Sequence, residues 1–212
     1  MTFASREDAG QRLGRRLRDE AVEVDLVIGL PRGGVVVAAE VARVLQRPLG
    51  ALVVRKIGHP FHREFAVGAL AECGVLVLDE NLIDRSARAR AELDAIVAEE
   101  TKRLHHYEDR FRSGGELDLT DKKVVLVDDG LATGATTEAA VLSARKRRAG
   151  KVLVAAPVAS TNAVERLGLI ADAVMALLVD PEFVAVGGYY RFFSQTSDEQ
   201  VVDLLRSEAA PH

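Results

Sequence analysis

Apolar residues recur along the chain with helical spacing in some segments and as short uninterrupted runs in others. The first helical segment begins near Ser5, and acidic residues follow in its first turn, where they complement the helix dipole. Its apolar face consists of residues four positions apart, namely Ala9, Leu13, Leu17 and Ala21. The chain is therefore predicted to open with an amphipathic helix.

Short apolar runs alternate with further helical segments over the rest of the chain. Strands are predicted at 25–30, 49–54, 67–71, 75–78, 124–127, 151–158 and 173–179. Helices are predicted at 35–45, 84–112, about 137–148 and 162–167, and from Ser197 onward. This alternation indicates the α/β fold class, with a mostly parallel, doubly wound sheet in a single domain over residues 1–212. Such sheets bind ligands at the carboxyl ends of their strands.

Residues 56–66 follow neither period and contain Gly58 and Pro60. They are predicted to form a mobile loop without regular structure. His59 and His62 lie three positions apart in this segment, but no third ligand accompanies them, so a metal site is not predicted there.

The composition is typical of a soluble, cytoplasmic globular protein, with 48% hydrophobic and 28% charged residues. The net charge of −4 provides no basic face for nucleic acid, and no apolar run has the length of a membrane span. An anionic ligand would therefore need a local site. The single cysteine, Cys73, excludes an intramolecular disulfide and is expected to be a small buried residue.

Residues 124–137 (VVLVDDGLATGATT) join an apolar strand to a helix through two acids and a turn of small residues. The turn would present free N–H groups, threonine hydroxyls and a positive helix end to an anion, and Gly134 would let the backbone approach it closely. Asp128 and Asp129 would lie at the strand end and accept hydrogen bonds from vicinal hydroxyls. Ribose 5-phosphate fits both halves; the alternative is an ordinary turn with capping threonines.

This pattern of four apolar residues, two acids, three variable residues and Thr-Gly-x-Thr resembles the signature with which type I phosphoribosyltransferases bind 5-phosphoribosyl-1-pyrophosphate (PRPP). With the segments LPRGG, VRKIG and FAVG, the chain is similar to a group of bacterial phosphoribosyltransferases over most of residues 24–195. The resemblance implies transfer of the phosphoribosyl group to a nitrogenous base or amine, with release of pyrophosphate. The resemblance also implies Mg²⁺ as cofactor, held mainly by PRPP and water. No membrane partner is expected, and the protein could form a homodimer.

The resemblance also assigns residues to the parts of PRPP. The expected catalytic residues are Asp128, Asp129, Lys56 and Arg32. The 5′-phosphate would bind Ala132, Thr133, Gly134, Ala135, Thr136 and Thr137, and the pyrophosphate would bind Arg32, Gly33, Gly34, Arg55 and Lys56. In this family the loop around Arg32 often holds an unusual non-proline peptide bond, expected here between Arg32 and Gly33, and the segment after Lys56 closes over the pyrophosphate.

Residues 180–196 interrupt the strand–helix alternation and are rich in aromatic residues. They resemble the hood of purine-salvage members, to which the first helix is a further candidate contributor. In that hood an aromatic ring stacks on the base and a backbone carbonyl reads its edge. The candidate base-binding residues are therefore Phe183, Val184 and Tyr190, with Phe193 as an equal alternative.

Ala132 departs from the pattern of the 6-oxopurine members, which have an aspartate there as acid/base. This makes hypoxanthine and guanine less favoured acceptors and leaves xanthine, adenine, a pyrimidine or a small amine. Two other functions stay open: a PRPP-sensing regulator without catalysis, and a hydrolase acting on a sugar phosphate.

Overall fold

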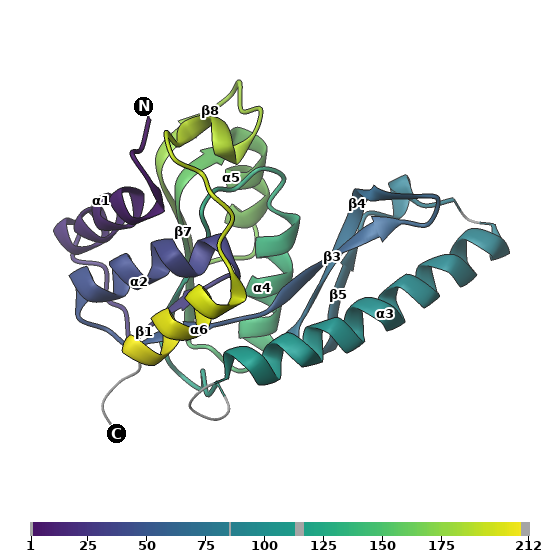
Figure 1. The fold of residues 1–212 in the computed structure, drawn as a ribbon, viewed down its shortest axis with the longest axis horizontal. Helices are drawn as coiled ribbons and strands as arrows, with labels where there is room; N and C mark the ends of the chain where they lie inside the picture. The colour runs from purple at the N-terminus through teal and green to yellow at the C-terminus, as the bar shows by residue number, and fades with distance from the viewer. Residues whose placement is uncertain (1, 85, 113–116, 209–212) are drawn as a thin grey trace.

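Five parallel strands form the central sheet, in the order β2-β1-β6-β7-β8, in a computed structural model that describes residues 2–84, 86–112 and 117–208 (Figure 1). They are β1 (Leu26–Gly29), β2 (Leu49–Ala51), β6 (Lys123–Val127), β7 (Lys151–Ser160) and β8 (Ala173–Asp180). Each is an apolar run, as strands covered on both faces require. The predicted α/β class with a mostly parallel sheet is confirmed.

The carboxyl ends of β1 and β6 lie side by side, with Gly29 paired to Val127. The N–H of Leu30 donates to the carbonyl of Val127 over 2.9 Å, so the two chain segments are still hydrogen-bonded to each other just after β1 ends. The segments that follow, 30–34 and 128–134, therefore emerge together at the edge of the sheet where α/β folds bind ligands.

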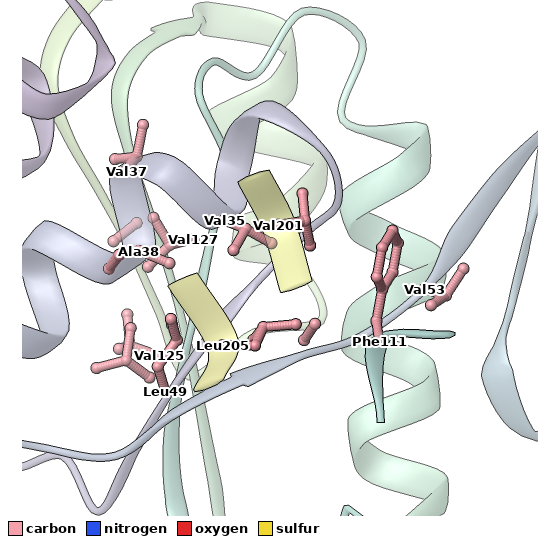
Figure 2. Packing of buried hydrophobic residues seen from close by; sticks show 14 of the residues in the cluster. Val35, Val37, Ala38, Leu49, Val53, Phe111, Val125, Val127, Val201 and Leu205 are labelled. Atoms are coloured by element: carbon pink, nitrogen blue, oxygen red, sulfur yellow. The ribbon is translucent and has the colours of Figure 1, made fainter. Parts of the chain in front are cut away.

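Helices cover both faces of the sheet. On one face lie α1 (Arg6–Asp19), α2 (Gly33–Leu45) and α6 (Asp198–Ser207), and on the other lie α4 (Ala135–Lys146) and α5 (Thr161–Gly168). Figure 2 shows the core of the first face, where Val201 and Leu205 of α6 lie with Val35 of α2 and Leu49 of β2. Alternate strand residues supply the two cores, which explains why the strands are apolar throughout.

A second, antiparallel sheet projects from the body as an arm (Figure 1). It consists of β3 (Val54–His59), β4 (His62–Ala71) and β5 (Val75–Leu78), and α3 (Ala87–Phe111) runs along it. Three short 3₁₀ turns complete the described elements: η1 (Glu72–Gly74), η2 (Glu80–Leu82) and η3 (Val186–Tyr189). No helix within the described ranges is both long enough and apolar enough to pass through a membrane.

The prediction of an irregular loop at 56–66 is wrong, because β3 and β4 pair through it as an antiparallel hairpin. The residues that break regular structure stand where a hairpin tolerates them. Pro60 lies in the turn, and Gly58 lies at a register shift where a Cβ would come within 2.4 Å of the Arg63 carbonyl oxygen. The strand predicted at 49–54 is also divided, since β2 ends in the body and β3 begins in the arm.

A buried carboxylate anchors the arm to the body. Glu72 follows β4, is 0% exposed, and accepts a 2.8 Å hydrogen bond from the N–H of Val53. Its carboxylate also binds the guanidinium groups of Arg112 and Arg147. Because Val53 directly precedes β3, this carboxylate fixes the place where β3 leaves the body.

Cys73 is exposed, so the expectation that it is buried is wrong. It lies in the turn η1 with a φ of 62°. The neighbouring Glu72 occupies the buried position, which its two arginine partners and the Val53 amide make tolerable for a carboxylate.

Candidate active site

A cavity of about 500 Å³ opens at the sheet edge where β1 and β6 end. Three chain segments line it, residues 31–33, 53–56 and 128–137 except Ala135, together with Tyr107 and Phe111 of α3 and Val186 of η3. The loops after two neighbouring strands thus share one cavity with the base of the arm.

Asp128 lies directly after β6, and its Oδ1 accepts a 2.8 Å hydrogen bond from the N–H of Asp129. Burial, followed by the neighbouring Asp129 carboxylate, raises the pKa of Asp128 well above its ordinary value, against weaker opposing effects that include the charge of Lys56. The position of Asp128 at this strand end therefore opposes ionisation of its carboxyl group.

Asp129 is held from both ends of the chain. Its Oδ2 accepts a 2.8 Å hydrogen bond from Nε of Arg6 in α1, and its backbone carbonyl accepts one of 2.5 Å from the hydroxyl of Tyr190. Arg6 also donates to the carbonyl of Ser194 over 2.7 Å and lies over the ring of Phe193 at 3.9 Å. The first helix and the segment 180–196 therefore fix this carboxylate jointly.

The turn at 132–137 leads into the amino-terminal end of α4. Gly134 has a φ of 77° and caps α4, whose first helical hydrogen bond runs from the N–H of Glu138 to the Gly134 carbonyl over 2.8 Å. The preceding N–H groups have no helical carbonyl to bond, and they lie at the positive end of α4. Of the six residues predicted to bind the 5′-phosphate, Ala135 does not line the cavity.

The loop after β1 contributes Pro31, Arg32 and Gly33 to the cavity. A cis peptide bond joins Pro31 to Arg32, one bond before the position that we predicted. The Arg32 side chain is 48% exposed, with Nη1 3.7 Å from Oδ1 of Asp198. Gly34 does not line the cavity; a Cβ there would lie 2.8 Å from the Val127 carbonyl oxygen, so this glycine serves close packing.

Arg55 and Lys56 reach the cavity from β3, that is, from a strand and not from a loop. Arg55 is engaged within the arm, because its Nε lies 2.8 Å from Oε2 of Glu100 and its guanidinium lies 5.5 Å from the Tyr107 ring. Lys56 is exposed. The cation available to a ligand from this side of the cavity is therefore Lys56 more than Arg55.

The predicted base-binding residues do not reach the cavity. Phe183 stacks on Tyr189 with ring centroids 5.3 Å apart, and Val184 is 92% exposed. Tyr190 is buried beneath Asp129 and packs between Phe3 and the ring of Phe193. These aromatic residues form the hood's own small core, and Val186 is the hood residue that lines the cavity.

Sequence reasoning missed Arg6, Val186 and the pair Tyr107 and Phe111. Tyr107 and Phe111 are four positions apart, so their shared helix face was readable, but nothing local related it to the loop after β6. Arg6 is one of several arginines on the polar side of α1, and only the tertiary fold distinguishes it.

In the described part of the chain, no group of three or more His, Cys, Asp or Glu side chains is arranged to hold a metal ion. Asp128 and Asp129 nevertheless line the cavity and offer carboxylate oxygens, which are suitable ligands for Mg²⁺. Such an ion would need most of its ligands from a phosphorylated substrate and water.

The phosphoribosyl transferase domain family model matches residues 5–167. Two Mycobacterium tuberculosis proteins, MT0597 and Rv0571c, bear the provisional name phosphoribosyl transferase and are each 45% identical to this chain over 204 residues. These alignments cover 96% of this chain and 46% of each relative, so the chain spans about half the length of the curated relatives it matches. An amidophosphoribosyltransferase of Haemophilus influenzae is 28% identical over 159 residues, which are 72% of this chain and 25% of that protein.

Two solved structures share this fold. TT1426 from Thermus thermophilus has a TM-score of 0.81 at 42% identity, and the match covers 99% of this chain and 100% of that one. A purine phosphoribosyltransferase from Pyrococcus horikoshii has a TM-score of 0.52 at 17% identity over 92% and 96% of the two chains, a likeness of fold alone. Because the family model matches more than half of the residues and includes both loops that line the cavity, this chain belongs to the phosphoribosyl transferase domain family.

Proposed function

We propose that this chain transfers the 5-phosphoribosyl group of PRPP to a nitrogenous acceptor and releases pyrophosphate, with Mg²⁺ as cofactor. The observation that carries the proposal is one cavity lined by the turn at 132–137, the two aspartates and the loop at 31–33. A phosphate, a ribose diol and a pyrophosphate are the three groups that these parts are suited to bind.

The 5′-phosphate would occupy the turn. Free N–H groups, the hydroxyls of Thr133 and Thr136, and the positive end of α4 all favour an anion there. The aspartates cannot favour the phosphate, but a carboxylate accepts hydrogen bonds from the 2′- and 3′-hydroxyls of ribose. Asp129 is suited to this task because Arg6 and Tyr190 hold it in one position.

Breaking the anomeric C–O bond develops positive charge on the sugar and negative charge on the leaving pyrophosphate. Asp128 and Asp129 would lie beside the sugar, and Arg32, Lys56 and the N–H of Gly33 would face the pyrophosphate. Fixed charges of this kind stabilise a transition state without reorganising during the reaction. When bound, Mg²⁺ would supply further positive charge to the pyrophosphate.

Calorimetry with PRPP and Mg²⁺ on the purified protein and on Asp129→Asn tests this proposal, together with an assay of pyrophosphate release. We expect the wild type to bind and the variant to bind at least about tenfold more weakly, a loss above about 1.4 kcal/mol. Absence of binding by folded wild type rejects the proposal. PRPP binding without pyrophosphate release with any acceptor would instead indicate a PRPP sensor. Pyrophosphate release at the same rate with and without an acceptor would indicate a hydrolase.

A further inference from the structure

Small and aliphatic residues form the part of the cavity lining that would face the acceptor, and they bear on which acceptor binds. This inference rests on the proposed function. In a displacement at the anomeric carbon, the nucleophile approaches from the side opposite the leaving group. Arg32, Gly33 and Lys56 mark the pyrophosphate side of the cavity. Beyond the aspartates, the lining includes residues 130–132 and Val186, which we take as the acceptor wall.

Val186 lies directly against Gly130. A Cβ placed on Gly130 would come within 2.7 and 2.8 Å of the two Val186 methyl groups and within 3.2 Å of Cγ1 of Val158. The hood therefore contacts the loop after β6 directly at Gly130, on this side of the cavity.

The hood around Val186 is held in place. Val186 begins η3, and the hydroxyl of Tyr190, at the end of that turn, donates to the Asp129 carbonyl over 2.5 Å. The N–H of Phe3 donates to the carbonyl of Tyr189 over 2.8 Å. Widening the acceptor wall would therefore disturb contacts that also hold Asp129.

This wall also offers little with which to recognise the edge of a base. Ala132 replaces the acid that 6-oxopurine members use, and its carbonyl already accepts a 2.5 Å hydrogen bond from the Ser160 hydroxyl. The carbonyl of Leu131 accepts the N–H of Ser160 over 2.9 Å. The aromatic rings that do line the cavity, Tyr107 and Phe111, belong to α3, beside Arg55 on the pyrophosphate side.

We propose that the acceptor is ammonia or a short primary alkylamine, and not a purine or pyrimidine. The nitrogen lone pair forms the bond to the anomeric carbon, and the C–O bond to pyrophosphate breaks with its electron pair leaving on pyrophosphate. The nitrogen of the product then loses one proton to solvent. A free amine needs no deprotonation before attack, which agrees with the absence of an acid at Ala132.

The test compares acceptors on the wild-type protein with PRPP and Mg²⁺ at alkaline pH. Pyrophosphate release is measured with ammonium chloride, methylamine, adenine, hypoxanthine, xanthine and uracil, and without acceptor, and products are identified by mass. We expect the two amines to raise release by at least about tenfold over the acceptor-free rate, and the bases to leave it unchanged. Nucleotide formation from a base overturns the inference while the transferase function stands, and release that is equally fast without any acceptor indicates a hydrolase and overturns both. No PRPP turnover with any acceptor would instead defeat the proposed transferase function.

A matched pair of variants tests the wall itself. Val186→Ala removes the methyl groups that lie against Gly130, whereas Val179→Ala makes the same change at a 45% exposed residue of β8 outside the cavity lining. We expect Val186→Ala to raise the rate with benzylamine relative to methylamine by about tenfold, the scale at which pocket methyl groups discriminate. Val179→Ala should match the wild type, and a melting temperature confirms that both variants fold. An unchanged amine preference in folded Val186→Ala contradicts the assignment of this wall.

Discussion

Arg6 donates a 2.8 Å hydrogen bond from Nε to Oδ2 of Asp129, which lies 123 positions further along the chain. Both side chains are largely buried, at 11% and 16% exposed. A charged hydrogen bond in this setting is stronger than one at the surface, and removing one partner leaves the other charge partly buried. The first turn of α1 is therefore part of the candidate active site.

Replacing this arginine should affect PRPP binding more than folding. Arg6→Gln removes the charge beside Asp129, so we expect affinity for PRPP with Mg²⁺ to fall by about tenfold or more. Arg6→Lys should restore part of it, because it keeps the charge but loses the guanidinium geometry. The control is Arg12→Gln on the same helix, whose partner Asp8 lies outside the cavity lining. Calorimetry measures all three, and equal affinity of Arg6→Gln and wild type would refute a positioning role.

Gly33 has no room for a side chain beside the same carboxylate. A Cβ there would lie 2.1 Å from Oδ2 of Asp129 and 2.7 Å from Nε of Arg6. We expect Gly33→Ala to displace the Asp129 carboxylate and to lower kcat/KM for PRPP by about tenfold or more. Gly168→Ala is the matched control, because nothing lies within 4 Å of its Cβ position. Equal kcat/KM values for Gly33→Ala and Gly168→Ala would show that the space beside Asp129 at Gly33 is unimportant.

Lys56 presents a positive charge to the cavity from the exposed side of β3. Because an exposed side chain contributes little to the core, Lys56→Ala should keep its melting temperature while pyrophosphate release slows by about tenfold or more. Lys102 of α3 is also exposed but does not line the cavity, so Lys102→Ala should leave both quantities unchanged. A loss of melting temperature that parallels the loss of activity would make Lys56 structural.

Glu72 should matter to stability, since its carboxylate is buried with Arg112, Arg147 and the Val53 amide as partners. Glu72→Gln keeps an acceptor oxygen but removes a fully buried negative charge that faces two guanidinium groups, so the free energy of unfolding should fall by about 3 kcal/mol. The comparison is Glu99→Gln, which weakens only exposed pairs with Arg63 and Arg103 and should cost under about 1 kcal/mol. Urea unfolding of both variants gives the difference directly, and equal costs would exclude the anchoring role.

The sheet and the turn at 132–137 were predictable because their signals are local. Uninterrupted apolar runs marked β1, β6, β7 and β8, and the acids and small residues after Val127 marked the turn. The hairpin of the arm was not predictable, because Gly58 and Pro60 disguise a strand pair that long-range packing against α3 and α4 supports. The sequence could not place Phe183 and Tyr190 relative to the cavity for a related reason: aromatic composition indicates a cluster, and only the fold decides whether its rings face a ligand or one another.

Asp128 should make the stability of the fold depend on pH, because the ionised carboxylate that would serve the proposed function is the less stable form in the folded protein. Burial and the neighbouring Asp129 raise the pKa of Asp128 in the folded protein, so the folded state holds this proton more tightly than the unfolded state does. The associated stability is fully present below the ordinary carboxyl pKa of about 4 and is lost as pH rises through the raised folded value. Asp128→Asn has no proton to lose, and its side-chain oxygen can still accept the Asp129 N–H.

We therefore expect the melting temperature of Asp128→Asn, relative to wild type, to increase as pH rises from about 5 to about 9. Over the same pH range, its kcat/KM for PRPP should be lower than that of the wild type by about tenfold or more, because the substituted amide no longer offers an anion to the ribose. Thermal unfolding at a series of pH values checks the first statement and steady-state kinetics the second. A variant whose relative stability falls with pH would show that the ionised Asp128 is stabilised in the fold, contrary to the burial and repulsion seen at this strand end.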